Sequence, residues 1–262
     1  MKKQILKVIS LSNLFLLLCS CTSGKHYEVN DYLAGSLEIQ ERFTICQLND
    51  IHVEVGSDLN KQFEYIKKVI NARNLVGENE TFDLPDLLVL NGDTFMNANK
   101  GVVTRWLDMM DTLKIPYCFN YGNHDYQGRY PNNFIDDELI KRRFNNEDHF
   151  AFYPKVKDDD VFGRSNYFVN ITDSGNTIFQ VYLLDSNTYR GFKYDNIHED
   201  QIRWYERCVR ESNGLGENDP IKTNMIKDIL TFLAKRVEKK EYYNMQINNE
   251  DFKGNLSLLI AK

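Results

Sequence analysis

Three apolar runs of the sequence each end in a short polar cluster, and this repeated pattern restricts the fold more than any other feature. The runs span residues 43–48, 87–90 and 117–120. Continuous apolar runs of this length predict strands of a parallel sheet that is covered on both faces. The carboxyl ends of such strands share one edge of the sheet, so we expect the three polar clusters to lie close together. The clusters are Asp50-Ile51-His52, Gly92-Asp93-Thr94 and Gly122-Asn123-His124-Asp125.

Helices are predicted between these strands by apolar residues at helical spacing. The stretches 59–74 and 102–113 each carry such an apolar stripe. Strands and helices therefore alternate, which predicts an α/β fold with right-handed crossover connections. Farther along, the patterns predict helices at 136–144, 199–211 and 221–239, a hairpin of strands at 167–171 and 177–184, and a last strand at 256–261.

Each polar cluster has an ordinary structural interpretation when it is taken alone. Asp50 could cap a helix or a turn, Gly92-Asp93 is a common turn, and Gly122-Asn123 is typical of a hairpin turn. The combination is more informative, because carboxylate, imidazole and amide groups at three neighbouring strand ends can bind hard or borderline divalent metal ions. The sequence therefore predicts a metal site at this edge of the sheet.

Charge limits the classes of partner. The formal net charge is −6, and the sequence has no basic stripe with interleaved aromatic residues. Nucleic-acid-binding proteins need clustered Lys and Arg to contact phosphates, so we expect no nucleic-acid partner. An acidic protein can still act on a phosphorylated small molecule when bound metal ions supply the local positive charge.

The N-terminus has the pattern of an export signal. Lysines precede an apolar run at 9–18 that is too short to span a bilayer as a helix. The next residues, Leu18-Cys19-Ser20-Cys21, resemble a bacterial lipobox, which implies cleavage before Cys21 and attachment of lipid there. We therefore predict a signal peptide at 1–20, a tether at 21–42 and a lipid-anchored protein of the bacterial cell envelope, periplasmic or at the cell surface. Simple secretion or an uncleaved short anchor is the alternative.

The three clusters, in this order and each at the end of a strand, resemble the DxH, GDxx and GNH(D/E) signatures of the calcineurin-like metallophosphoesterases. Three further stretches resemble the branch nearest the purple acid phosphatases, and the resemblance extends from about residue 43 to about residue 209. These stretches are Asn166-Tyr167-Phe168-Val169, Tyr182-Leu183-Leu184-Asp185-Ser186 and Gln201-Ile202-Arg203-Trp204-Tyr205. The resemblance implies a metallophosphoesterase-type α/β/β/α sandwich at 43–262 with an incomplete second sheet.

The resemblance also implies a role for each residue of the clusters. The implied metal ligands are Asp50, His52, Asp93 and Asn123. Asp93 would bridge two divalent ions, of manganese, zinc or iron, and these would activate a water that hydrolyses a phosphate ester. His124 would act on the scissile phosphate as a proton donor or charge stabiliser, and Asp125 would orient its ring. Met96 stands where purple acid phosphatases place an iron-binding tyrosine, so tyrosinate-bound iron is not expected.

The sequence departs from this family pattern in its second half. The family completes its metal centre with a histidine after a later strand and a Gly-His-x-His cluster, and His26, His149 and His198 match neither. A truncated reading frame after the strand at 256–261, or a diverged protein, would explain this. We therefore expect weak or single-metal binding and low or no phosphatase activity. A catalytically inactive surface lipoprotein that uses the scaffold for binding is the alternative to an active hydrolase, and a partner copy could also supply ligands.

Overall fold

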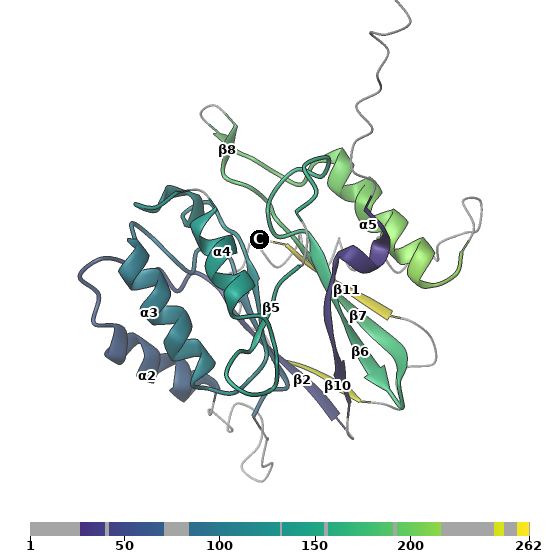
Figure 1. The fold of residues 1–262 in the computed structure, drawn as a ribbon, viewed down its shortest axis with the longest axis horizontal. Helices are drawn as coiled ribbons and strands as arrows, with labels where there is room; N and C mark the ends of the chain where they lie inside the picture. The colour runs from purple at the N-terminus through teal and green to yellow at the C-terminus, as the bar shows by residue number, and fades with distance from the viewer. Residues whose placement is uncertain are drawn as a thin grey trace, which may run out of the picture.

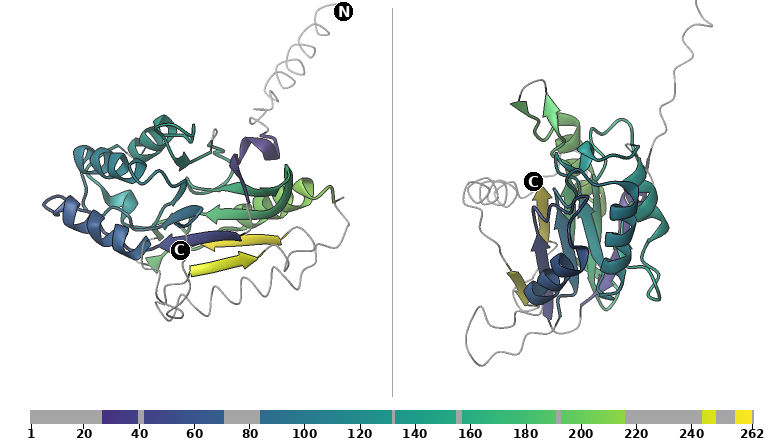
Figure 2. Two further views of the ribbon diagram at one scale, coloured as in Figure 1. Left: turned by 90° about the horizontal axis from the view of Figure 1, so that it is seen from below. Right: turned by 90° about the vertical axis from the view of Figure 1, so that its left-hand side faces the viewer.

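Two stacked β-sheets form the centre of the molecule, and helices lie on both of its outer sides. The computed structural model describes residues 27–39, 42–70, 84–131, 133–154, 157–190, 193–215, 244–248 and 256–261. Figures 1 and 2 show helices on one side of the sheets that lie opposite the helix on the other side. The helices on the first side are α2 (Leu59–Ile70), α3 (Lys100–Asp111) and α4 (Phe134–Lys141), and the opposite helix is α5 (Glu199–Ser212). The predicted α/β sandwich is confirmed.

The first sheet contains the three predicted apolar strands at its centre. Its order is β10-β2-β3-β4-β5, and β2, β3, β4 and β5 run parallel whereas β10 is antiparallel to β2. Every residue of β3 and β4 is buried, as expected for strands covered on both faces. The strands are β2 (Arg42–Leu48), β3 (Leu87–Asn91), β4 (Tyr117–Asn120), β5 (Ala151–Phe152) and β10 (Asn244–Asn248).

The second sheet is built around the predicted hairpin. Its order is β1-β6-β7-β11, with β1 (Leu33–Glu38), β6 (Tyr167–Asp173), β7 (Asn176–Leu184) and β11 (Leu256–Ala261). Side chains of β6 and β7 alternate between two cores: Val169 and Leu183 belong to the core shared with the first sheet, whereas Tyr182 packs in the core under α5. This period-two alternation is what a strand with two covered faces requires. A small separate hairpin pairs β8 (Tyr189–Arg190) with β9 (Lys193–Tyr194).

The structure corrects the predicted tether at 21–42. β1 pairs in parallel with β6, and it is preceded by a short 3₁₀ helix, η1 (Val29–Asp31). The ring of Tyr32 is buried and packs edge-on against Trp204 of α5, with ring centroids 5.4 Å apart. The tether was predicted because this segment has few aliphatic residues. A buried aromatic side chain such as Tyr32 can nevertheless hold the segment against the core.

Two predictions fall on residues outside the described ranges, namely the signal peptide at 1–20 and the helix at 221–239. Among the helices that the structure describes, none has the length and apolar character needed to cross a bilayer.

Gly35 of β1, in the second sheet, packs directly against the ring of Phe152 of β5, in the first sheet. A Cβ atom on Gly35 would lie 2.1 Å from Cε1 of that buried ring. We therefore expect Gly35→Ala to lower the free energy of unfolding by about 1–3 kcal/mol through overpacking, measured by urea denaturation. Gly101→Ala is the matched control: its Cβ would meet nothing closer than 3.5 Å, and alanine in a helix should raise stability by about 0.5–1 kcal/mol. Equal effects of the two changes would contradict this account of the sheet contact.

Candidate metal centre

The loops that leave β2 and β3 pair along their backbones. The N–H of His52 donates to the carbonyl of Asp93 at 3.0 Å, and the N–H of Val53 donates to the carbonyl of Thr94 at 2.8 Å. This pairing continues the parallel sheet beyond the regular ends of the strands. It places two of the predicted polar clusters side by side.

Three of the predicted metal ligands adopt left-handed backbone conformations. The φ angles are 52° at Asp50, 54° at His52 and 52° at Asp93. A positive φ is uncommon for residues other than glycine, and such strain concentrates at functional sites because surrounding contacts must enforce it. The unusual backbone therefore supports the functional interpretation of these loops, independently of the chemistry of their side chains.

Four polar side chains converge at this edge of the sheet. Nε2 of His52 lies 3.7 Å from Oδ2 of Asp93 and 3.8 Å from Oδ1 of Asp50. One potential ligand atom each from His52, Asp93 and His124 lies within 4.8 Å of the other two. The rings of His52 and His124 meet edge to face, with centroids 5.2 Å apart. The structure thus brings together residues from all three sequence clusters.

The donor atoms of this group fit a divalent metal ion. Nε2 of His52 and Nδ2 of Asn123 are buried atoms that have no hydrogen-bond partner among the described residues. Buried polar atoms are rarely left unpaired, and the two ends of an amide are interchangeable, so a turned Asn123 would offer its oxygen instead. Two imidazoles with carboxylate and amide oxygens suit manganese, zinc or iron. A bound cation would therefore satisfy atoms that the chain itself leaves unsatisfied.

Asp125 stabilises the loops that carry the predicted metal ligands. Its buried carboxylate accepts N–H bonds from Asp93 at 2.9 Å, from Phe95 at 2.8 Å and from Gly122 at 2.8 Å. The carboxylate of Asp93 in turn accepts the N–H of His124 at 2.9 Å. These bonds tie the second and third clusters together. The role predicted for Asp125, that of orienting the His124 ring, stays a prediction, because the group that the structure places at Nδ1 of that ring is Oε1 of Gln127, at 3.0 Å.

A second set of bonds joins the residues on either side of the third cluster to the end of β7 in the second sheet. The side-chain amide of Asn120, at the end of β4, donates to the carbonyl of Leu184, at the end of β7, at 3.0 Å. The hydroxyl of Tyr126 donates to Asp185, whose carboxyl has a pKa raised by burial. The carboxyl ends of β4 and β7 therefore meet, and the candidate centre lies where the two sheets come together.

The two other histidines of the described residues lie beside carboxylates elsewhere in the fold. Nδ1 of His149 lies 3.5 Å from the carboxylate of Asp111. Nε2 of His198 lies 3.0 Å from Asp195, and the ring of His198 stacks on Phe162 with centroids 4.0 Å apart. Neither histidine belongs to the group of converging ligand atoms found in the described part of the chain.

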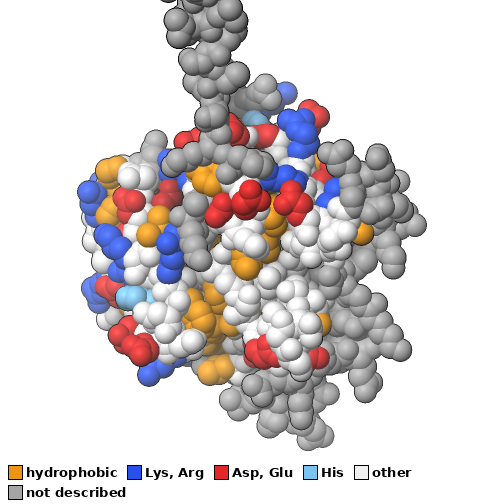
Figure 3. Space-filling model, turned by 45° about the vertical axis from the view of Figure 1, so that its right-hand side comes forward, with side chains coloured by type: hydrophobic (Ala, Val, Ile, Leu, Met, Phe, Trp, Pro, Cys, Tyr) orange, Lys and Arg blue, Asp and Glu red, His pale blue; other side chains and the backbone are white. Residues whose placement is uncertain are grey.

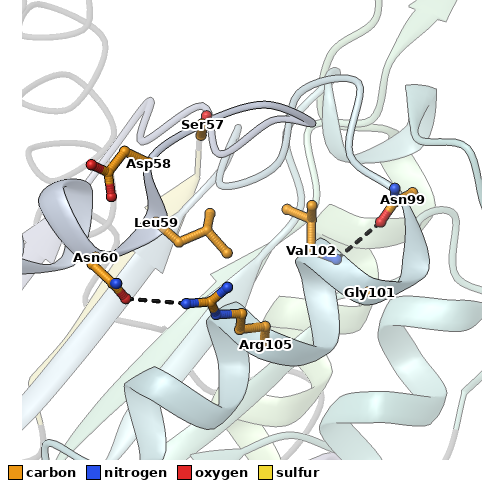
Figure 4. Close-up of a pocket in the computed structure, with 8 residues that line it drawn as sticks. All are labelled: Ser57, Asp58, Leu59, Asn60, Asn99, Gly101, Val102 and Arg105. Atoms are coloured by element: carbon orange, nitrogen blue, oxygen red, sulfur yellow. Dashed lines mark hydrogen bonds between the residues drawn. The ribbon is translucent and has the colours of Figure 1, made fainter.

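A pocket of about 400 Å³ opens between the N-terminal ends of α2 and α3 (Figure 4). Within it, the guanidinium of Arg105 donates to Oδ1 of Asn60 at 3.3 Å, and Oδ1 of Asn99 accepts the N–H of Val102 at 3.0 Å. Its lining includes none of the four predicted metal ligands. The pocket is therefore a separate feature of the same helical side of the molecule.

Three contributions to this site were not predicted from the sequence. Gln127 was not singled out, although its position three residues after His124 places the two side chains within reach in a helical turn. The close packing of Gly122 against Asp93 could not be predicted, because a glycine at this position is equally explained by a turn. The left-handed backbone of the ligand residues had only one weak sign in the sequence. Asp adopts such conformations more often than most residues do.

Comparisons with known proteins agree with this geometry. A family model described as calcineurin-like phosphoesterase matches residues 43–228. Phosphatase DCR2 of Saccharomyces cerevisiae is 26% identical over 193 residues, which are 66% of this chain and 33% of that protein. A probable cyclic nucleotide phosphodiesterase of Fibrobacter succinogenes is 25% identical over 157 residues, which are 60% of this chain and 56% of that protein. The matched regions thus span between about a third and somewhat over half the length of these relatives.

Gly122 offers a direct test of the site. A Cβ atom there would lie 2.3 Å from Oδ1 of Asp93 and 2.5 Å from its backbone nitrogen. We expect Gly122→Ala to displace Asp93 and to weaken manganese binding about 10- to 100-fold, the effect typical of a lost supporting contact around metal ligands. Isothermal titration measures the affinity, and circular dichroism checks that the variant is folded. Gly101→Ala serves again as the control, and unchanged affinity in a folded Gly122→Ala chain would contradict the proposed placement of Asp93.

Proposed function

The chain belongs to the calcineurin-like phosphoesterase family, and from this premise we propose that it hydrolyses phosphate esters in a metal-dependent reaction. The observation that carries the proposal is the convergence of His52, Asp93 and His124, with potential ligand atoms within 4.8 Å of one another. The names of the two relatives, a phosphatase and a probable phosphodiesterase, support the same class of reaction.

The side chains divide the work at the site. Asp50 and His52 would hold one metal ion, Asn123 would hold a second, and the carboxylate of Asp93 would contact both. Two divalent ions, when bound, supply positive charge for the phosphoryl oxygens and a water with a lowered pKa. His124 would act on the scissile phosphate as a proton donor or charge stabiliser. Asp125 keeps the loops in place by accepting three backbone N–H bonds.

We place the chain near the purple-acid-phosphatase branch of the family, on the strength of the stretches around Tyr167, Leu184 and Trp204. The first two end up on the paired strands β6 and β7, and the third lies on α5. Met96 in place of tyrosine supports manganese, zinc or ferrous iron over a tyrosinate-bound ferric ion.

The proposed substrate is a phosphorylated small molecule. Acidic and basic side chains are interspersed on the face that Figure 3 shows, which gives no support to a nucleic-acid surface there. The export signal and the lipobox-like Leu18-Cys19-Ser20-Cys21 support a lipid-anchored protein of the cell envelope. Metal ions would then supply the local positive charge that the acidic chain lacks.

A binding function without catalysis is the second candidate. Two of the histidines in the described residues, His149 and His198, have partners away from the converging group. Counted over the described residues, the centre then has fewer protein ligands than stable two-metal sites offer, which favours weak or single-metal binding. Metal content separates the two candidates, since two ions per chain favour the hydrolase and none favours the binding role.

Activity tests the proposal. We expect the purified chain, supplied with manganese, to hydrolyse p-nitrophenyl phosphate at a rate that EDTA abolishes. His52→Ala should lower kcat/KM at least 100-fold because it removes a ligand, and Asp93→Asn should do the same because a neutral amide replaces the charged carboxylate that would contact both ions. His149→Gln should leave kcat/KM within about twofold. A folded, metal-loaded chain that hydrolyses neither this ester nor bis-p-nitrophenyl phosphate would overturn the hydrolase and favour the binding role.

Membrane attachment is tested separately at Cys21. We expect Cys21→Ser to move the protein, expressed in a bacterial host, from the membrane fraction to the soluble fraction, because the acyl chains supply the anchoring free energy. Cys19→Ser, a change two residues away that keeps Cys21, should stay with the membrane. An unchanged distribution for Cys21→Ser, measured by fractionation and immunoblotting, would exclude lipid on that cysteine.

A further inference from the structure

The pocket between the N-terminal ends of α2 and α3 plays no part in the proposed reaction. Its volume of about 400 Å³ lies in the range that small-molecule sites occupy. Leu59 of α2 and Val102 of α3 form an apolar part of its lining, and the other side chains that line it are polar or charged. A pocket with one apolar region and a few polar groups can hold an organic molecule in a fixed orientation.

Arg105 is the cation among the lining residues. It is exposed on α3, and Figure 4 shows its side chain extending toward Asn60 of α2. The bond that it donates to Oδ1 of Asn60 is 3.3 Å long, which exceeds the usual limit of about 3.2 Å, and Arg105 forms no ion pair with a carboxylate of the described residues. A guanidinium carries its N–H donors in a planar fork that matches the oxygens of a carboxylate or a phosphate. An anionic ligand would therefore bind Arg105 more strongly than this amide does.

The electrostatics of the two helix ends favour an anion on the α3 side of the pocket. Asp58, at the start of α2, also lines the pocket, but its Oδ1 accepts the N–H of Lys61 at 3.1 Å, and Figure 4 shows its carboxylate turned away from Arg105. At the start of α3 the cap is the neutral amide of Asn99, which accepts the N–H of Val102, and the first turn carries no acidic side chain. The positive end of the α3 dipole therefore adds to the charge of Arg105.

The pocket is near the candidate metal centre along the chain, but it is a separate site. The loop from His52 reaches the lining at Ser57 after five residues, and the loop from Asp93 reaches it at Asn99 after six. The predicted metal ligands are not part of the lining. An anion bound here would therefore be held by the side chains of the pocket and would need no metal ion.

We propose that this pocket binds a small organic anion, with its carboxylate or phosphate group on the guanidinium of Arg105 and its apolar part on Leu59 and Val102. The inference goes beyond the proposed function and does not rest on it, because no bond of the ligand is made or broken in the pocket. The guanidinium fixes the charged end of the ligand, and the apolar contacts favour an organic anion over an inorganic one.

Binding is measured on the metal-free chain, so that the metal centre does not compete for the probe. The probe is phenylphosphonate, which has an anionic head on an aromatic ring and no ester bond to hydrolyse. We expect it to shift the backbone ¹H–¹⁵N signals of Gly101 and Val102 and to leave that of Gly122 unchanged. Inorganic phosphate, which lacks the apolar part, should bind about fivefold more weakly. Unshifted signals at Gly101 and Val102 would overturn the inference.

Arg105→Gln tests the charged contact. We expect the affinity for phenylphosphonate to fall about tenfold, because a hydrogen bond to a charged group is lost, and Arg105→Lys, which keeps the charge without the fork, should lose less. Arg203→Gln removes an exposed arginine from α5, so it is the matched control and should bind as the unaltered chain does. Because Arg105 is exposed, its replacement leaves the core intact, which circular dichroism checks. Equal affinities of Arg105→Gln and Arg203→Gln would contradict the proposed role of Arg105.

Val102→Thr tests the apolar contact, since it places a hydroxyl where a methyl group lines the pocket. We expect it to weaken binding of phenylphosphonate about threefold and to leave binding of inorganic phosphate unchanged. His52→Ala alters the metal centre alone and should keep the full affinity for phenylphosphonate. A loss of affinity in His52→Ala that matches the loss in Arg105→Gln would place the probe at the metal centre and overturn the separate site.

Discussion

The hydrogen bonds to the carboxylate of Asp125 hold the candidate centre together. They link backbone groups that follow β3 and β4 through one side chain, although these two segments lie far apart in the sequence. Hydrogen bonds to a charged acceptor contribute about 1.5–3 kcal/mol each, and a buried N–H that loses its partner costs a similar amount. A residue expected to serve one histidine ring therefore has a wider structural task. The carboxylate supports the loops that carry both Asp93 and His124.

The same loops contain strained backbone, and this strain explains why they need so much support. Left-handed conformations at residues other than glycine cost on the order of 1–3 kcal/mol each. Asp50, His52 and Asp93 all adopt them, and backbone pairing between the two loops holds His52 and Asp93 in place. The side chains are thereby aimed at one another before any metal arrives. A flexible loop would instead lose conformational freedom on binding, which weakens the affinity for an ion.

Much of the fold could be predicted from local pattern, and much of the site could not. β3 and β4 are continuous apolar runs and were recognisable as buried strands, whereas β5 has only two residues and β8 and β9 are equally short. β1 was missed because its docking depends on Tyr32 meeting α5, a contact between segments far apart in sequence. The clusters identified which side chains converge. The contacts of Gln127 and Gly122 depend on three-dimensional packing, to which sequence spacing gives no access.

The docking of the segment before β1 has a mechanical consequence for an anchored protein. Tyr32 is packed against α5, so a fixed point of the folded body lies eleven residues after Cys21. Eleven residues of fully extended chain reach about 40 Å at most. Under the proposed lipid attachment, the globular part would be confined to a thin layer next to the bilayer. The candidate metal centre would then meet dissolved esters close to the lipid surface. The short connection to the lipid would restrict the orientations in which substrates can approach.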